Sequence, residues 1–171
     1  IGAHVGMEHL IGGATWLSAA IEAPGVIGQY SQFRRIVLGE FKGEMTTRLK
    51  TIYETLQTTG TTTALSDNIQ KVLWTKFVFI SSVSAIGSLT RVSFGEFRHV
   101  PEARVLLTEA MEEVASVAQS RGVTLDQDVI GKTLEFIDHS ASTLKPSMQR
   151  DVEAGRPSEL ESLIGIVARL G

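Results

Sequence analysis

The 171-residue sequence contains no cysteine, and this absence removes several functions at once. Without thiols, the chain forms no disulfide, offers no thiol nucleophile and supplies no thiolate to a metal. The four histidines are not paired at metal-ligand spacing, so we expect no metal site. A chain without cysteine is more typical of a reducing compartment, and we expect a cytoplasmic protein.

Other absences exclude further classes of protein. There is no Gly-x-Gly pair for a dinucleotide, no glycine-lysine phosphate loop and no Gly-x-Ser-x-Gly elbow of a serine hydrolase. The net charge is −3 and the basic residues are scattered, so we expect no nucleic-acid partner. No uninterrupted apolar run approaches the roughly 20 residues that span a bilayer, so we expect no membrane partner. The start lacks both a methionine and the basic segment of a signal peptide, and we expect it to lie within a longer protein.

What is present describes a globular chain that changes character near Ser66. Apolar residues make up 43% of it and charged residues 20%, which is normal for a protein with a core. Before Ser66 the pattern predicts a small α/β part, with Pro24-Gly25 at the centre of a type II turn in a hairpin or meander. The expected strands are Ala14–Ile21, Gly25–Tyr30, Arg35–Leu38 and Thr61–Leu65, with one helix between Glu44 and Thr58.

After Ser66 the apolar residues recur at helical spacing almost throughout. Ser66 or Asp67 is expected to cap a long helix that reaches about Ser88. The sequence therefore predicts a mainly α chain, with a first part at residues 1–65 and a helical domain at residues 66–171. The later helices are expected over Phe94–Phe97 with Ser93 as cap, from Pro101 to Gly122, from Asp126 to His139, from Pro146 to Gly155, and from Pro157 onward.

Lys76 is the candidate catalytic residue. It follows Leu73 by three residues and precedes Ile80 by four, so it lies within the apolar stripe of the long helix. Burial there would lower the pKa of its amine towards the range that suits proton transfer. The alternative is a lysine at the rim of a helix interface, with its stem buried and its amine in water. Ser84 lies two turns further along the same face and either shares a cavity with Lys76 or simply packs in a helix interface.

Two further polar residues occur near expected helix starts. Glu159 follows Pro157-Ser158, where a carboxylate stabilises the helix dipole and caps free amides. Ser147 follows Pro146 and has the same simple explanation. From the residues alone, the result is a helical domain with one unusual lysine.

Three segments resemble the 2-dehydropantoate 2-reductase (ketopantoate reductase) family, and the resemblance covers nearly the whole chain with its spacing kept. The first is Ile21-Glu22-Ala23-Pro24-Gly25-Val26-Ile27 with Leu38-Gly39-Glu40, and the second is Trp74-Thr75-Lys76-Phe77-Val78-Phe79. The third, and the most specific, runs from Pro146-Ser147-Met148-Gln149-Arg150-Asp151 to Pro157-Ser158-Glu159-Leu160.

The resemblance implies a two-domain enzyme that reduces the ketone of ketopantoate to give pantoate for coenzyme A synthesis. It implies a Rossmann-type half that binds NADPH, of which residues 1–65 would be the tail, with the glycine fingerprint upstream of this chain. The helical half would be of the 6-phosphogluconate dehydrogenase C-terminal type, through which related dehydrogenases often form homodimers. A fragment without most of the cofactor site is expected to be inactive.

The resemblance also implies roles for individual residues. Lys76 matches the family lysine that stabilises the developing oxyanion and delivers the proton. Glu159 matches a carboxylate that accepts a hydrogen bond from a substrate hydroxyl, and Ser147 matches a serine that binds the substrate carboxylate. The family usually has asparagines four and eight residues after the lysine, where this chain has Ile80 and Ser84.

That departure keeps three alternatives open. The substrate is a different 2-oxo acid, the chain belongs to another branch of the dehydrogenase superfamily that acts on hydroxy acids, or it is a non-catalytic helical dimerisation module. In the last case, the stripe from Ile69 to Gly87 would be the seam between subunits.

Overall fold

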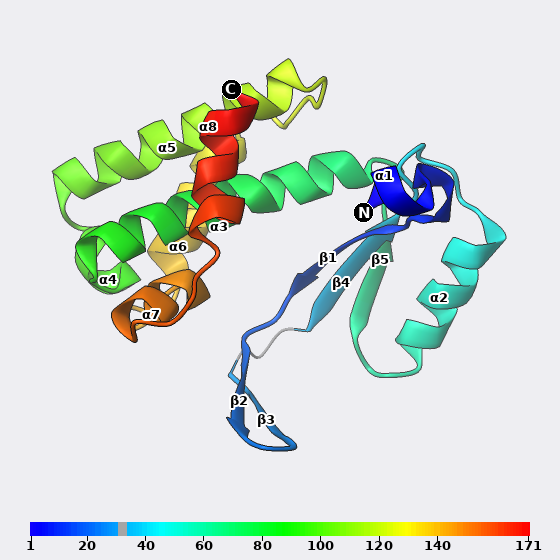
Figure 1. Ribbon diagram of the computed structural model, residues 1–171, viewed down its shortest axis with the longest axis horizontal. Coiled ribbons are helices and arrows are strands. Elements are labelled where there is room, and N and C mark those ends of the chain that lie inside the picture. The colour runs from blue at the N-terminus through cyan, green and yellow to red at the C-terminus, as the bar shows by residue number, and fades with distance from the viewer. Residues whose placement is uncertain (31–33) are drawn as a thin grey trace. The chain divides into compact units, whose positions relative to one another are not determined.

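The computed structural model describes residues 1–30 and 34–171. They form two compact units, Ile1–Leu73 and Trp74–Gly171, each of which is described by itself (Figure 1). One helix, α3 (Ile69–Thr90), begins in the first unit and continues into the second. The units therefore divide within α3, after the boundary expected from the sequence at residues 65 and 66.

A three-stranded sheet forms the centre of the first unit, with strand order β1-β4-β5. The central strand is β4 (Arg35–Gly39). The outer strand β1 (Gly12–Trp16) runs antiparallel to β4, and the other outer strand, β5 (Thr62–Leu65), runs parallel to β4. Parallel neighbours need a crossover, and α2 (Thr47–Gln57) supplies it. The unit thus contains one β-α-β crossover, in keeping with the α/β part expected before the long helix.

A separate hairpin joins β2 (Ala19–Ala23) to β3 (Val26–Gln29). Gly25 has φ of +79° after Pro24, as the third residue of a type II turn requires. The single strand expected over Ala14–Ile21 is instead two strands in different sheets. The expected hairpin is confirmed by β2 and β3, whereas the alternative of a meander is not, because β1 pairs with β4; strand-forming residues do not specify their partner.

The chain starts with two short helical segments that the pattern did not predict. They are α1 (Gly2–Val5) and a 3₁₀ turn over Met7–His9. Neither contains a buried residue, so no apolar periodicity marked them.

Glycines at the end of the sheet allow α3 to start against it. Gly12 and Gly39 are paired across β1 and β4, and both lie against Ile69, which is buried. A Cβ atom on Gly12 would lie 2.7 Å from Ile69 Cγ1, and one on Gly39 would lie 2.8 Å from Ile69 Cβ. Both distances are too short for carbon atoms, so this approach requires glycine at both positions.

The first unit also contains a buried ion pair. Glu40 is only 5% exposed and follows β4 directly. Arg48 on α2 binds it with both Nε, at 2.8 Å from Oε1, and Nη2, at 2.6 Å from Oε2, and Thr46 also donates to Oε1. The hydrogen bonds from Arg48 outweigh the effect of burial and lower the pKa of Glu40 to about 2. The pair ties the end of β4 to the start of α2.

The second unit is helical, and the mainly α fold class expected from the sequence is confirmed. Asn68 caps α3, since its Oδ1 accepts the Lys71 amide at 3.0 Å, so the helix starts slightly later than expected from Ser66 or Asp67. The other elements are α4 (Phe94–Phe97), α5 (Pro101–Ser120), α6 (Val129–His139), α7 (Ser147–Glu153), a π-helical turn (Glu161–Gly165) and α8 (Ile166–Leu170).

Apolar side chains from four of these helices form the core around α3. The buried members come from α3, α4, α5 and α6 and are Val78, Val83, Ile86, Phe94, Phe97, Ala103, Leu107, Met111, Val114 and Ile137. Phe79 on α3 adds edge-to-face contacts with Phe94 and Phe136 at centroid distances of 6.4 and 5.3 Å.

Helix α3 is long and apolar enough to cross a membrane by length and composition alone, with a mean hydropathy of 1.5. This is weak evidence, because the core helix of a globular domain passes the same test. The core just described explains the composition: Val78, Val83 and Ile86 of α3 are among its buried members.

Candidate functional site

Lys76 lies on α3 close to the start of the second unit and is half-buried. Burial lowers the pKa of its amine. The neighbouring rings of Trp74 and Phe77 meet edge to face at 5.6 Å, so the turn of helix around Lys76 is rich in apolar surface. An amine with a lowered pKa gives up its proton more readily than an ordinary lysine, which is the property that a proton donor needs near neutral pH.

Ile80 and Ser84 follow Lys76 at intervals of four residues and therefore lie on the same face of α3. Ile80 is half-buried, and Ser84 is 1% exposed. The face thus presents an amine, an aliphatic side chain and a buried hydroxyl over about two helical turns.

The start of α7 packs near the far end of the same face. A Cβ atom on Gly87, three residues after Ser84, would lie 2.4 Å from Gln149 Oε1 and 3.4 Å from Pro146 Cδ. Ser147, between these two residues, begins α7 and is exposed, whereas Gln149 is fully buried. The structure thus places Ser147 at the Ser84–Gly87 end of α3, whereas Lys76 lies about 16 Å before Gly87 along the helix axis.

Glu159 belongs to a segment that is attached to α3 between these points. Its carbonyl accepts the amides of Ser162 at 3.1 Å and Leu163 at 2.8 Å, and Ser81 on α3 donates to the Leu163 carbonyl at 2.7 Å. The carboxylate-bearing residue itself is exposed and precedes the π-helical turn. The expected helix start at Pro157-Ser158 was too early, so Glu159 stands before the helical turn and not inside it.

Two of the four predicted site residues lie on α3, and the other two lie on segments that pack against α3 at different points. Lys76 and Ser84 are on α3, Ser147 is on the helix that packs at Gly87, and Glu159 is on the segment bound at Ser81. Ser81 follows Lys76 by five residues and therefore lies about 140° around α3 from it, so the Glu159 segment packs on another side of this helix than the one that carries Lys76 and Ser84.

The sequence analysis missed a polar network beside α7 that is centred on the buried Gln149. Gln149 donates from Nε2 to the Val92 carbonyl at 3.1 Å and to Glu153 Oε1 at 2.8 Å, and Lys145 binds the same carboxylate at 2.8 Å. Hydrogen bonds from Lys145 and then Gln149 lower the pKa of Glu153. The i, i+4 spacing of Gln149 and Glu153 was the only signal in the sequence.

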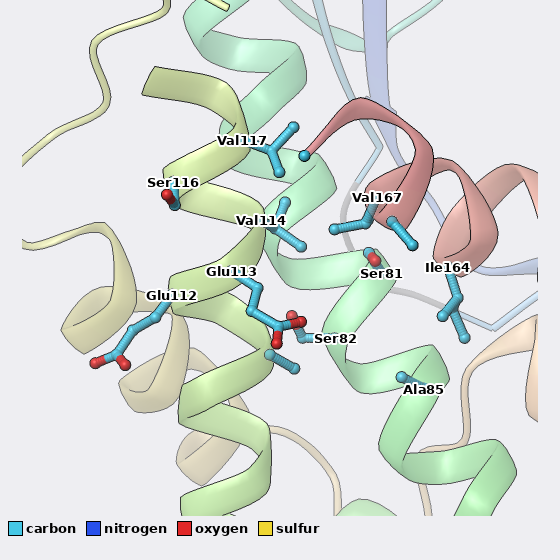
Figure 2. A pocket seen from close by; sticks show the side chains of 13 residues that line it. Ser81, Ser82, Ala85, Glu112, Glu113, Val114, Ser116, Val117, Ile164 and Val167 are labelled. Atoms are coloured by element: carbon cyan, nitrogen blue, oxygen red, sulfur yellow. The ribbon is translucent and has the colours of Figure 1, made fainter. Parts of the chain in front are cut away.

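A groove in the second unit was also missed. It lies between α3, α5 and the last helical segment and has a volume of about 660 Å³ (Figure 2). Its walls are mostly small and apolar side chains, which the sequence pattern assigns to an ordinary core.

We assign no residue of the described chain to a metal ion or to a cofactor. Within residues 1–30 and 34–171, no cluster of three or more His, Cys, Asp or Glu side chains is arranged to hold a metal ion. The first unit has a β-α-β crossover but no glycine-rich phosphate loop in its sequence, so we assign none of its residues to a dinucleotide.

A small α/β unit followed by a helical unit is the fold of a family of oxidoreductases. The chain belongs to the ketopantoate reductase family. The family model described as ketopantoate reductase PanE/ApbA C terminal matches residues 68–171.

Individual relatives agree with this assignment. The chain is 28% identical over 167 residues to a 2-dehydropantoate 2-reductase of Mesorhizobium japonicum, covering 98% of this chain and 50% of that protein. It is 26% identical over 160 residues to an uncharacterised oxidoreductase, YkpB, of Bacillus subtilis, covering 94% and 53%. The chain thus spans about half the length of the curated relatives it matches.

Solved structures show the same fold. A 2-dehydropantoate 2-reductase from Geobacter metallireducens has a TM-score of 0.86 at 26% identity, covering 99% of this chain and 58% of that one. D-mandelate dehydrogenase, solved with NADH, has a TM-score of 0.85 at 23% identity, covering 96% and 56%, a likeness of fold alone.

Proposed function

We propose that the whole protein reduces a 2-oxo acid to a 2-hydroxy acid with NADPH, and that ketopantoate is the first substrate to test. The half-burial of Lys76 and the lowered pKa of its amine are the observation that carries the proposal. Relatives named 2-dehydropantoate 2-reductase supply the substrate, and the resemblance supplies the cofactor.

NADPH supplies a hydride to the carbonyl carbon when it is bound, and the residues of this chain act on the substrate side. The carbonyl oxygen gains negative charge as the hydride arrives, and the Lys76 ammonium stabilises that charge. The same ammonium then gives its proton to the oxygen, which completes the alcohol, and the neutral amine regains a proton from water.

The other site residues have binding roles in this proposal. The Ser147 hydroxyl donates to the substrate carboxylate, and the Glu159 carboxylate accepts a hydrogen bond from a substrate hydroxyl. Ser84 offers a further hydroxyl on the Lys76 face. The burial of Ser84 and the exposure of Ser147 and Glu159 fit a site that is dry on α3 and open where a substrate enters.

Replacing Lys76 tests the proposal directly. In the whole protein, Lys76→Ala is expected to lower kcat for NADPH oxidation with ketopantoate by about a thousandfold, because both charge stabilisation and proton delivery are lost. Lys71→Ala, on the same helix, is the matched control and should keep full activity. Equal turnover in wild type and Lys76→Ala would contradict the role of Lys76.

Ile80 favours a second candidate, a reductase of a 2-oxo acid whose side chain is apolar. A half-buried isoleucine one turn after Lys76 has no group to pair with a substrate hydroxyl, and an unpaired hydroxyl is costly to bury. A panel of 2-oxo acids with apolar and hydroxylated side chains should then show higher kcat/KM for the apolar group. Ile80→Asn is expected to shift the ratio towards ketopantoate by about tenfold or more. A ratio that Ile80→Asn leaves unchanged would exclude Ile80 as a specificity residue.

A non-catalytic dimerisation module is the third candidate. Burial within the single chain argues against the stripe from Ile69 to Gly87 as its subunit interface. Val83 and Gly87, which belong to the expected seam, are already buried within a single chain. A homodimer through other parts of the helical unit remains part of our proposal, as does a cytoplasmic location. Lys76→Met distinguishes the reductase from the non-catalytic module. If Lys76 is only structural, the variant should fold with unchanged stability or a gain. If Lys76 is the proton donor, the variant should lose turnover.

A further inference from the structure

The corner between α3 and α4, residues 91–93, is where α7 is attached to the rest of the helical unit. Arg91 directly follows α3 and has φ of +59°, in the left-handed region, so the chain turns sharply before α4 begins at Phe94. The Phe94 amide donates to the Leu144 carbonyl at 3.0 Å, three residues before α7 begins. The segment that leads into α7 is therefore bound at this corner.

Gln149 makes a second attachment, from inside α7. Its side chain is fully buried, and its Nε2 donates to the Val92 carbonyl of the corner at 3.1 Å and to Glu153 Oε1 at 2.8 Å. Glu153 is the last residue of α7, and Lys145, just before the helix, binds the same carboxylate at 2.8 Å. Both amide hydrogens of Gln149 are thus used. A carboxamide that bridges the corner and the end of its own helix allows α7 little rotation about its axis.

The oxygen of the same carboxamide lies against α3 at Gly87. A Cβ atom on Gly87 would overlap Gln149 Oε1, so the close approach of the carboxamide requires glycine there. Oε1 itself has no hydrogen-bond partner among residues 1–30 and 34–171. A methionine would fill the same space without an unpaired oxygen. What glutamine adds at this position is therefore its two directed donor bonds, and not its packing.

Ser147 lies on the other side of α7. It precedes Gln149 by two residues, which places the two side chains about 200° apart around the helix. Ser147 is exposed, whereas Gln149 is buried. A rotation of α7 by about 20° would move the Ser147 hydroxyl by roughly 1–2 Å, more than a hydrogen bond to a carboxylate tolerates. The contacts on the buried side of α7 therefore set the position of the Ser147 hydroxyl.

We propose that Gln149 is a positioning residue for the reduction. It holds α7 on the corner between α3 and α4 in the rotation in which the Ser147 hydroxyl meets the substrate carboxylate. This inference rests on the reductase function proposed above. Gln149 acts through Ser147 and does not touch the substrate, so its loss weakens substrate binding and leaves proton delivery from Lys76 intact.

The test is the steady-state kinetics of the whole protein with saturating NADPH and the 2-oxo acid that the wild type reduces best. Gln149→Met is expected to raise KM for the acid by about tenfold and to change kcat by less than about twofold, because binding geometry is lost and proton delivery is kept. KM for NADPH should not change. Thr133→Val is the matched control: it removes another buried hydrogen bond of the same unit, from Thr133 Oγ1 to the Val129 carbonyl, and should leave KM for the acid unchanged.

A double-mutant cycle with Ser147→Ala separates positioning from a merely structural role. Ser147→Ala alone is expected to raise KM for the acid by about tenfold or more, because a charge-assisted hydrogen bond is lost. Without that hydroxyl, Gln149 has nothing left to position, so Gln149→Met should raise KM by less than about twofold in the Ser147→Ala background. Additive increases in the double variant would mean that Gln149 acts on another group and would overturn the proposal.

Gly87→Ala disturbs the same carboxamide without changing Gln149. Its Cβ atom displaces the Gln149 side chain, so KM for the acid should rise with kcat kept, again only when Ser147 is present. This variant provides the same test if Gln149→Met does not fold. A fall in kcat at unchanged KM, in either variant, would contradict the positioning role.

The positioning role and the reductase function fail in different ways. If the wild type reduces the acid and Gln149→Met keeps the wild-type KM, the positioning role is overturned and the reductase function stands. If the wild type reduces no 2-oxo acid in the panel, the reductase function is overturned and the positioning role with it.

Discussion

The two units of this chain stabilise their cores in different ways. The first unit buries few large side chains and ties its elements together with glycine contacts and the Glu40–Arg48 pair. The second unit buries a cluster of aliphatic and aromatic side chains from four helices and leaves its ion pairs, such as Arg104–Asp138, partly exposed. The difference implies that the first unit is sensitive to charge and pH, whereas the second is sensitive to the volume of its core.

One tryptophan in each unit makes this comparison measurable. Trp16 is in β1, and Trp74 is the first residue of the second unit. Replacing either one by phenylalanine leaves a fluorescent reporter in the other unit, so the unfolding of each is followed separately.

The largest expected effect is in the core of the second unit. Phe94 is 1% exposed and contacts Phe79 and Phe97. Phe94→Ala is expected to lower the free energy of unfolding of this unit by about 4 kcal/mol, through lost burial and the cavity that remains. Urea titration followed by Trp74 measures the loss, and the same titration followed by Trp16 should show a much smaller one. Equal losses at both reporters would mean that the units unfold as one.

A smaller effect is expected from acid on the first unit. The pKa of Glu40 is about 2 in the folded chain against 4.5 without its partners, because Arg48 binds the carboxylate. Its contribution to stability is therefore complete above about pH 5 and is lost as the pH falls towards 2. We expect Trp16 to report a loss of about 2 kcal/mol over this range beyond the loss that remains in Glu40→Gln.

Glu40→Gln also provides the control for that experiment. The glutamine variant should already be less stable at neutral pH, and its first unit should depend less on pH. Other carboxylates with lowered pKa values, those of Glu96, Asp138 and Glu153, are in the second unit and report through Trp74. If wild type and Glu40→Gln lost stability in parallel at Trp16, the buried pair would not be the source of the acid sensitivity.

The two units also differ in how well the sequence predicted them. The helices of the second unit were expected within a few residues, since a repeat near 3.6 is visible in the sequence and the capping residues, such as Ser93 bound to Glu96, mark the ends. The strands of the first unit were found, but their pairing was not. Nothing local in β1 indicates that its partner is β4, about twenty residues later, and not its neighbour β2.

The candidate site shows the same limit. The position of Lys76 within an apolar stripe left two interpretations, a desolvated amine with a lowered pKa or a rim lysine with its amine in water; Lys76 is half-buried and burial lowers the pKa of its amine, which agrees with the first. The attachment of α7 at Gly87 and of the Glu159 segment at Ser81 joins residues about sixty to eighty positions apart. Helical spacing carries no information about such contacts, so only the resemblance had brought Ser147 and Glu159 to the same site.

The smallest expected effect concerns Ser82 and has the opposite sign to the others. Its hydroxyl is buried and has no partner among residues 1–30 and 34–171, so Ser82→Ala removes an unpaired polar group and little volume. We expect the second unit to gain up to about 1 kcal/mol, measured by urea titration at Trp74. Ser81→Ala is the control: Ser81 donates to the Leu163 carbonyl, so its loss should destabilise the same unit by a similar amount. If Ser82→Ala also destabilised the unit, Ser82 would have a partner in solution and the groove would no longer contain an unsatisfied hydroxyl. A gain would mean instead that the Ser82 hydroxyl is buried without a partner in solution as well, and that its desolvation outweighs the packing that the oxygen provides.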